Sequence, residues 1–231
     1  MSDPARLLVL ASGRGSNYQA IQDAIERDRL PATVAAVISD RASAGALERA
    51  AGHGTDTVCI EPRNFADRTR FEQALQTAID GFDPRWIVLA GFMRVLGTDF
   101  VRRYEGRMIN IHPSLLPRHR GLHTHQRVLE AREHEHGASV HFVTPALDAG
   151  PVISRVRLRV ADDDTADTLA ARLLPLEHRL YPATLALLLH HHVELRDEEI
   201  CIDNQTIDTP LELGRDLDDG GHLVDRRDRG C

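Results

Sequence analysis

Short apolar runs alternate with amphipathic stretches along most of this chain, and that alternation limits the folds open to it. The clearest run is Trp86-Ile-Val-Leu-Ala90, which is nearly all apolar, as a parallel strand buried on both faces of a sheet should be. Further strands are expected over residues 6–11, 33–39, 57–60, 107–111, 138–143 and 152–160. The last two alternate in part, which favours an antiparallel pair.

Helical periodicity fills the segments between these strands. Helices are expected over residues 17–27, 44–51, 65–79, 123–132 and 165–190. Ser16 and Ser43 precede the first two and are candidate N-caps. Pro175 and Pro182 interrupt the last segment, so we expect a kink or two helices there rather than one straight rod.

This order of elements predicts an α/β fold, with a doubly wound, mostly parallel, Rossmann-like sheet flanked by helices and late antiparallel strands. Ligands of such sheets bind outside the carboxyl ends of the strands. We expect a single domain over residues 1–196, with halves of about 1–105 and 106–196. Residues 197–231 become acidic and aperiodic and are expected to form a poorly ordered tail.

Composition narrows the class of protein. The net charge of −7 disfavours non-specific binding of nucleic acid or of an anionic membrane. All 28 basic residues are Arg, which excludes a Schiff-base lysine. The three cysteines contain no CxxC pair, so a disulfide framework and a structural zinc site are not expected. With no signal peptide and no apolar stretch of the roughly 20 residues that span a bilayer, a cytoplasmic location is expected.

Residues 110–117, Asn-Ile-His-Pro-Ser-Leu-Leu-Pro, form the most informative motif. Asn110 and His112 are two apart, so on a strand their side chains point to the same face, and Pro113 ends that strand. Asp148 follows His112 by 36 residues in Asp-Ala-Gly. An amide donor, an imidazole and a carboxylate together suit attack on a carbonyl carbon without a covalent enzyme intermediate.

The first strand runs into a glycine loop, Ser-Gly-Arg-Gly-Ser-Asn over residues 12–17. Glycines allow a tight turn, and the amide groups at the start of the next helix bind anions. Tyr18 breaks the GxGxxG pattern and no Lys follows, so one phosphate fits better than a dinucleotide or a triphosphate. A plain tight turn is the alternative reading of the loop.

Thirteen histidines invite a metal interpretation, with dense spots at 123–125, 134–136 and 190–192. Histidines at i and i+2 on a helix do not share a face, and this spacing is not that of zinc ligands. No metal is therefore expected.

Four segments together resemble the phosphoribosylglycinamide formyltransferase family, the folate-dependent glycinamide ribonucleotide transformylases. They are residues 12–17, residues 90–94 (Ala-Gly-Phe-Met-Arg), the 110–117 motif, and the run from 136 to 151 that ends in Leu-Asp-Ala-Gly-Pro. The similarity extends from about residue 6 to about residue 182. Methionyl-tRNA formyltransferase and formyltetrahydrofolate hydrolase share the later motifs, but the glycine loop and the chain length favour the ribonucleotide enzyme.

The resemblance implies transfer of a formyl group from 10-formyltetrahydrofolate, a cosubstrate, to glycinamide ribonucleotide in purine biosynthesis, by a monomer or homodimer. It implies a catalytic trio of Asn110, His112 and Asp148. Residues implied to hold the ribonucleotide are Gly15, Ser16 and Asn17 at the phosphate and Glu177 at the ribose. Residues implied to bind folate are Arg68, Met93, Arg94, Val95, Leu96, Thr144, Pro145, Ala146 and Leu147. Leu174 stands where relatives often have a polar or basic residue, so that phosphate contact is not carried over.

Two alternatives remain open from the sequence. A hydrolase would pass the formyl group to water and would release formate without an amine acceptor. A nucleotide-binding module without catalysis would explain the glycine loop, but it would leave Asn110, His112 and Asp148 without a purpose. A dehydrogenase is disfavoured by the missing third glycine, and Asp40 at the end of the second strand is explained by a turn.

Overall fold

The computed structural model of this chain describes residues 3–224. It divides into two compact units between Asn110 and Ile111, close to the expected boundary between halves at about 105/106. The expectation of one domain over residues 1–196 stays a prediction. No helix of the described residues is long and apolar enough to cross a membrane.

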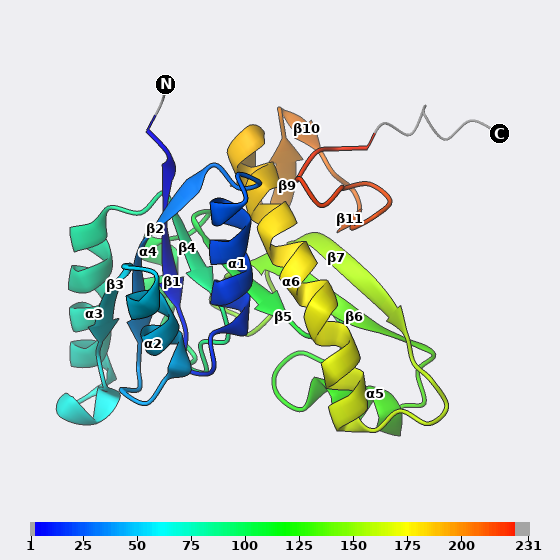
Figure 1. Ribbon diagram of the computed structural model, residues 1–231, viewed down its shortest axis with the longest axis horizontal. Helices are drawn as coiled ribbons and strands as arrows, with labels where there is room; N and C mark the ends of the chain where they lie inside the picture. Colours follow the sequence, from blue (N-terminus) through cyan, green and yellow to red (C-terminus); the bar gives the residue numbers. More distant parts are fainter. Residues whose placement is uncertain (1–2, 225–231) are drawn as a thin grey trace. The chain divides into compact units, whose positions relative to one another are not determined.

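The first unit is built on parallel strands in the order β5-β4-β1-β2-β3. Its strands are β1 Ala5–Leu10, β2 Ala32–Ser39, β3 Asp56–Cys59, β4 Trp86–Leu89 and the start of β5 Met108–His112. Its helices are α1 Ser16–Glu26, α2 Gly45–Gly52, the 3-10 turn η1 Pro62–Asn64, α3 Arg68–Phe82 and α4 Thr98–Arg103. The chain winds outward from β1 to β3 and then returns to β4 on the other side of β1, so the predicted doubly wound parallel sheet is confirmed (Figure 1).

The second unit contains the expected antiparallel pair, β6 Glu135–Phe142 with β7 Val152–Arg159. A short strand, β11 Leu211–Glu212, runs parallel to the outer edge of β7. A separate small antiparallel sheet has the order β10-β9-β8. Its strands are β8 Val193–Arg196, β9 Glu199–Ile202 and β10 Gln205–Thr206, and the helices of the unit are α5 Thr124–Glu130 and α6 Ala166–His190.

Both predicted serine N-caps are wrong. Gly15, with φ of 76°, is the N-cap of α1, so Ser16 is already the first helical residue. A Cβ at position 15 would lie 2.6 Å from the Cα of Ala46, so only glycine fits this turn against α2. Ala44, in extended conformation, is the N-cap of α2 in place of Ser43.

Of the two alternatives expected for the 165–190 segment, a kink or two helices, the division into two helices is not found, and the kink stays a prediction. Helix α6 is one continuous element that contains Pro175 and Pro182, visible as a single yellow-to-orange ribbon in Figure 1. Its C-terminal part, residues 180–188, is buried at every position. Packing of this apolar stretch outweighs the local cost of proline, since most helical stability in proteins comes from tertiary contacts.

The expected poorly ordered tail differs from the structure over residues 197–224, where β9, β10 and β11 form. Two contacts account for this order. Glu212 pairs with Arg155 and Arg157 of β7, and Gly221 lies so close to α6 that a Cβ there would be 2.5 Å from the Cβ of Ala186. The rest of the expected tail, 225–231, lies outside the described residues.

Candidate active site

Strand β5 carries the first two residues of the predicted trio. Met108, Ile109 and Ile111 are buried, and hydrophobic packing therefore fixes the strand. His112 is the last strand residue and is only 6% exposed, while Asn110 on the same face is half-buried. The sequence pattern thus places a carboxamide and an imidazole side by side at the carboxyl end of a strand, as predicted.

Both ring nitrogens of His112 face acceptors. The Nε2 lies 3.0 Å from the backbone oxygen of His119, and because a carbonyl only accepts, Nε2 carries a proton. The Nδ1 lies 3.4 Å from Oδ2 of Asp148. The carbonyl on one side and the carboxylate on the other therefore fix the orientation of the ring. His112 and Asp148 are therefore brought together as the sequence predicted.

Asp148 is held in a defined orientation by its backbone and by a neighbouring loop. Its φ is 47°, a left-handed conformation, and its Oδ2 accepts a hydrogen bond of 2.8 Å from the Gly121 amide. The side chain is 11% exposed. The amide donor and the His112 ring therefore meet the same oxygen of the carboxylate.

His141 is a further neighbour of the trio that the sequence assigned only to the sheet. Its Nε2 lies 3.8 Å from Oδ1 of Asp148, and its Nδ1 donates to the Phe142 carbonyl at 2.8 Å. Burial lowers the pKa of His141 to about 4, so this ring is neutral at pH 7. His112 and His141 therefore face opposite oxygens of one carboxylate.

The loop that follows His112 is anchored by serines. The Ser139 hydroxyl of β6 donates to the Ser114 carbonyl at 2.7 Å and accepts from the Leu116 amide at 3.2 Å. Both serines are completely buried. Buried polar atoms with satisfied hydrogen bonds rigidify their surroundings, so this link fixes the start of the loop relative to β6.

A second histidine pair lies near the trio. His125 Nδ1 and His136 Nε2 are 2.9 Å apart. Burial and the proximity of other histidines lower the pKa of His136 to about 4, and burial lowers that of His125. Within residues 3–224, no group of three or more His, Cys, Asp or Glu side chains is arranged so that it could hold a metal ion.

The predicted phosphate loop turns tightly at the start of α1. Gly15 in left-handed conformation precedes Ser16 and Asn17, the first two residues of α1. The Arg14 carbonyl accepts from Arg49 Nε of α2 at 2.9 Å, which supports the loop from outside. An anion at this helix start would meet backbone donors and the positive end of the dipole.

The same loop is tied to the segment after β4. The Ser12 amide donates to the Gly91 carbonyl at 3.0 Å, and the Ser12 hydroxyl accepts from the Met93 amide at 2.9 Å. The glycine loop and the predicted folate-binding residues 93–96 are therefore neighbours within the first unit. Met93 and Val95 are exposed, at 59% and 62%, whereas Leu96 is buried at 7%.

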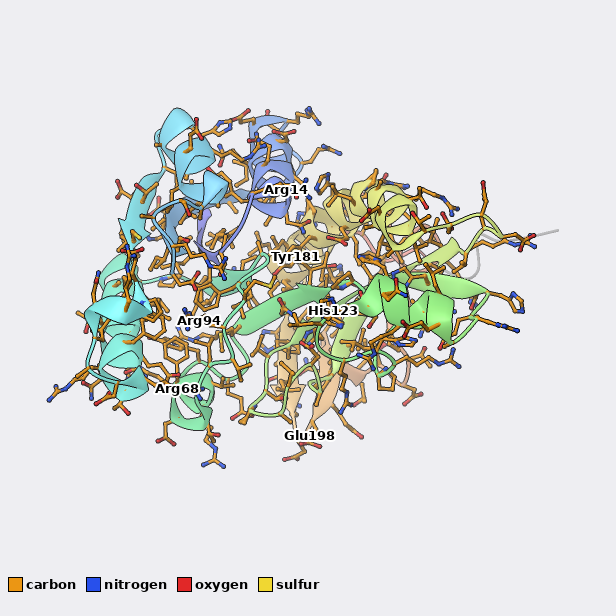
Figure 2. All side chains as sticks on the ribbon, turned by 90° about the horizontal axis from the view of Figure 1, so that it is seen from below. Arg14, Arg68, Arg94, His123, Tyr181 and Glu198 are labelled. Carbon is orange, nitrogen blue, oxygen red and sulfur yellow. The ribbon has the colours of Figure 1, made fainter. Side chains whose placement is uncertain are left out.

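A cavity of about 470 Å³ is lined by Met93, Arg94 and Val95, together with Arg68 and aromatic residues of the α3 region. Arg68 donates to the Val95 carbonyl at 2.9 Å, and Arg94 lies beside α3 in Figure 2. Arg94 Nε donates to Asp40 Oδ2 at 2.8 Å, and the Asp40 side chain is 1% exposed. The sequence interpretation of Asp40 as a turn residue missed its ion pair with Arg94, because the partner lies far away in the sequence and leaves no local signal.

A second cavity, of about 530 Å³, has Asp148 in its wall. Its lining is shared between residues 149–152 and the C-terminal segments 198–200 and 206–210. Sequence reasoning missed these C-terminal wall residues, because it assigns them to a poorly ordered tail.

The remaining predicted residues lie on separate elements. Thr144 to Leu147 form the loop before Asp148, in which Thr144 Oγ1 donates to the Ala146 carbonyl at 3.4 Å, and Leu147 is 54% exposed. Glu177 is half-buried on α6.

The chain is similar to known proteins over most of its length. A model of the formyl transferase family matches residues 5–185. Phosphoribosylglycinamide formyltransferase from Escherichia coli is 42% identical over 201 residues, which cover 87% of this chain and 95% of that protein.

Solved structures agree with that similarity. The phosphoribosylglycinamide formyltransferase from Coxiella burnetii is 46% identical with a TM-score of 0.87, and the match covers 90% of this chain and 99% of that one. Glycinamide ribonucleotide transformylase 1 from Symbiobacterium toebii is 37% identical with a TM-score of 0.84, over 87% and 95% of the two chains. The chain therefore belongs to the phosphoribosylglycinamide formyltransferases, within the formyl transferase family.

Proposed function

We propose that this protein transfers the formyl group of 10-formyltetrahydrofolate to the primary amine of glycinamide ribonucleotide, in de novo purine biosynthesis. The observation that carries the mechanism is His112, buried at a strand end with Nε2 on the His119 carbonyl and Nδ1 3.4 Å from Asp148. This arrangement supplies a proton-transfer group beside a fixed carboxylate, which suits direct acyl transfer to an amine.

The reaction forms one C–N bond and breaks another. The amine nitrogen of the ribonucleotide attacks the formyl carbon, a tetrahedral intermediate with an anionic oxygen forms, and the bond from that carbon to folate N10 then breaks. The amine nitrogen loses a proton and N10 gains one, so the step balances without a redox cofactor.

Asn110 and His112 would act on the intermediate. The Asn110 amide donates to the oxyanion, a contribution of typically ~10²–10³ in rate. The Nε2 proton of His112 is engaged by a carbonyl, so Nδ1 is the nitrogen through which the ring exchanges a proton. Proton transfer of this kind contributes roughly 10²–10⁴. Asp148 orients the ring and accepts the amine proton, directly or through a water.

The two substrates are assigned to chemically different surfaces, one of polar groups for the ribonucleotide and one of exposed apolar side chains for the folate ring. The backbone amides of Gly15, Ser16 and Asn17 would hold the phosphate, and Glu177 would accept the ribose hydroxyls. Exposed Met93 and Val95 beside the 470 Å³ cavity suit a flat apolar ring, with backbone groups of 94–96 at its edge.

We assign the loop 144–147 to folate binding as well, and Arg68 to the carboxylate tail of folate. The cysteine pattern supports a cytoplasmic location. The net charge of −7 disfavours nucleic acid and anionic membranes as partners. The enzyme would act on its two small-molecule substrates as a monomer or homodimer.

The test is an absorbance assay for loss of the formyl group from 10-formyltetrahydrofolate, with and without glycinamide ribonucleotide. We expect turnover only with the ribonucleotide, and a fall of at least ~10² in kcat for His112→Ala. His134→Ala, which changes an exposed histidine, is the matched control and should retain full activity. Formate release without the ribonucleotide would support the hydrolase, and near-normal kcat in His112→Ala would contradict the assigned mechanism.

A further inference from the structure

His119 orients His112 through its backbone carbonyl, at the ring nitrogen that does not face Asp148. The His119 carbonyl receives the Nε2 proton of His112, and His119 has φ of 53°. A residue with a Cβ rarely adopts this left-handed conformation unless its surroundings hold it there. The orientation of the catalytic ring therefore depends on whatever holds residue 119.

Glu133 makes two contacts with the loop segment that contains His119. Its Oε1 accepts from His119 Nε2 at 2.9 Å, and its Oε2 accepts from Arg118 Nη1 at 3.1 Å. The carboxylate thus bridges two successive side chains. The His119 side chain is 12% exposed and that of Glu133 22%, whereas the Arg118 side chain is 68% exposed, so the bond to His119 is the better shielded of the two.

Glu133 is itself fixed to the end of α5. Its amide donates to the Val128 carbonyl at 3.2 Å, so the backbone of Glu133 is hydrogen-bonded to α5. Burial raises the pKa of Glu133, but the hydrogen bonds from His119 and Arg118 outweigh that effect and hold the pKa below its ordinary value. The carboxylate is therefore ionised at pH 7 and accepts both bonds.

We propose that Glu133 is a positioning residue for the transfer reaction: it holds His119, whose carbonyl keeps His112 protonated on Nε2 and turns Nδ1 toward Asp148. The inference rests on the proposed function, because it assigns His112 the proton transfer. Glu133 touches no reacting atom in this scheme. It acts on the tautomer and the orientation of His112 alone.

The reach and the charge of Glu133 are separable by substitution. Glu133→Gln keeps an oxygen at the same reach as an acceptor for His119. Glu133→Asp keeps the charge but shortens the side chain by one methylene. If positioning is the role, Glu133→Gln should stay within about 3-fold of wild-type kcat, and Glu133→Asp and Glu133→Ala should lose on the order of 10-fold. The KM values for both substrates should stay unchanged in all three.

Glu130→Ala is the matched control, since it removes a carboxylate from an exposed site on α5, three residues earlier. It should keep the wild-type kcat. A larger loss in Glu133→Gln than in Glu133→Asp would overturn the proposal in favour of charge. Unchanged kcat in Glu133→Ala would overturn it, as would a rise in both KM values at constant kcat.

A readout without substrate separates this inference from the proposed function. In ¹⁵N NMR spectra, the His112 Nε2 signal should report a protonated nitrogen in wild type and in Glu133→Gln. In Glu133→Ala it should move toward the value of a mixed tautomer population. An unchanged signal would refute the positioning role even if formyl transfer is confirmed, whereas absence of formyl transfer by the wild-type protein would refute only the proposed function.

Discussion

Replacing Gly150 with alanine should displace Asp148 without touching any catalytic side chain. A Cβ at position 150 would lie 1.9 Å from the Phe142 carbonyl oxygen and 2.9 Å from its carbon, whereas real Cβ contacts stay beyond 3.0 Å. The Phe142 oxygen is held by the His141 ring at 2.8 Å, and the Phe142 amide donates to Pro151 at 3.0 Å. The chain around residue 150 must therefore move by roughly 1 Å.

A displacement of that size acts on both stability and rate. Overpacking costs about 1–3 kcal/mol, which for a chain of this length lowers Tm by roughly 2–12 °C. Asp148 is two residues away, and its contact with His112 is only 3.4 Å. A 1 Å misplacement costs up to ~10² in rate, so we expect a loss of that order in kcat.

The assay is formyl transfer at saturating substrates, with Tm measured by calorimetry on the same samples. Gly81→Ala is the matched control: it lies within α3, where an added Cβ meets nothing within 4 Å, and it should gain about 0.5–1 kcal/mol. Wild-type kcat in Gly150→Ala, even with a lowered Tm, would refute the argument that the loop shift reaches Asp148.

Two further predictions follow from the buried polar groups of β6. Ser139→Ala removes both the donor to Ser114 and the acceptor for the Leu116 amide, so the unfolding free energy should fall by about 1–3 kcal/mol in urea titrations; a change below 0.5 kcal/mol, on the order of a surface substitution, would contradict the anchoring role. Burial and neighbouring histidines lower the pKa of His136 to about 4, below its unfolded value near 6.5. The contribution of neutral His136 to the unfolding free energy is therefore fully present above pH 6.5. It is lost as the pH falls toward 4, by up to about 1.4 kcal/mol per pH unit. Unfolding free energies at pH 7 and pH 5 should differ less in His136→Gln than in wild type, and an equal difference in both would show that His136 does not titrate this way.

The parallel core could be predicted because its signals are local. The run at 86–90 has the all-apolar pattern of a doubly buried strand, and it forms β4 with every residue buried. Asn110 and His112 could be placed because the two-residue period of a strand fixes their common face. That His112 would meet Asp148 came from the resemblance, since a sequence separation of 36 residues carries no local distance information.

Features that depend on contacts across the chain escaped the sequence. The start of α1 is set by the approach of Gly15 to Ala46, so serine capping preference gave the wrong residue. The continuity of α6 depends on burial of its C-terminal part, which local proline cost does not register. Glu133, His141 and Asp40 each act through a partner at least seven residues away, so no spacing rule could single them out.

The short strand β11 also matters for how this protein behaves at high concentration. It pairs with Ser154 and Arg155, and Leu213 extends the pairing through the Arg155 carbonyl. Without it, β7 would present a row of unsatisfied amides and carbonyls, which is a template for pairing with another molecule. A protein shortened at residue 196 would thus keep the proposed catalytic trio yet gain an open strand edge, and aggregation rather than loss of chemistry would limit its use.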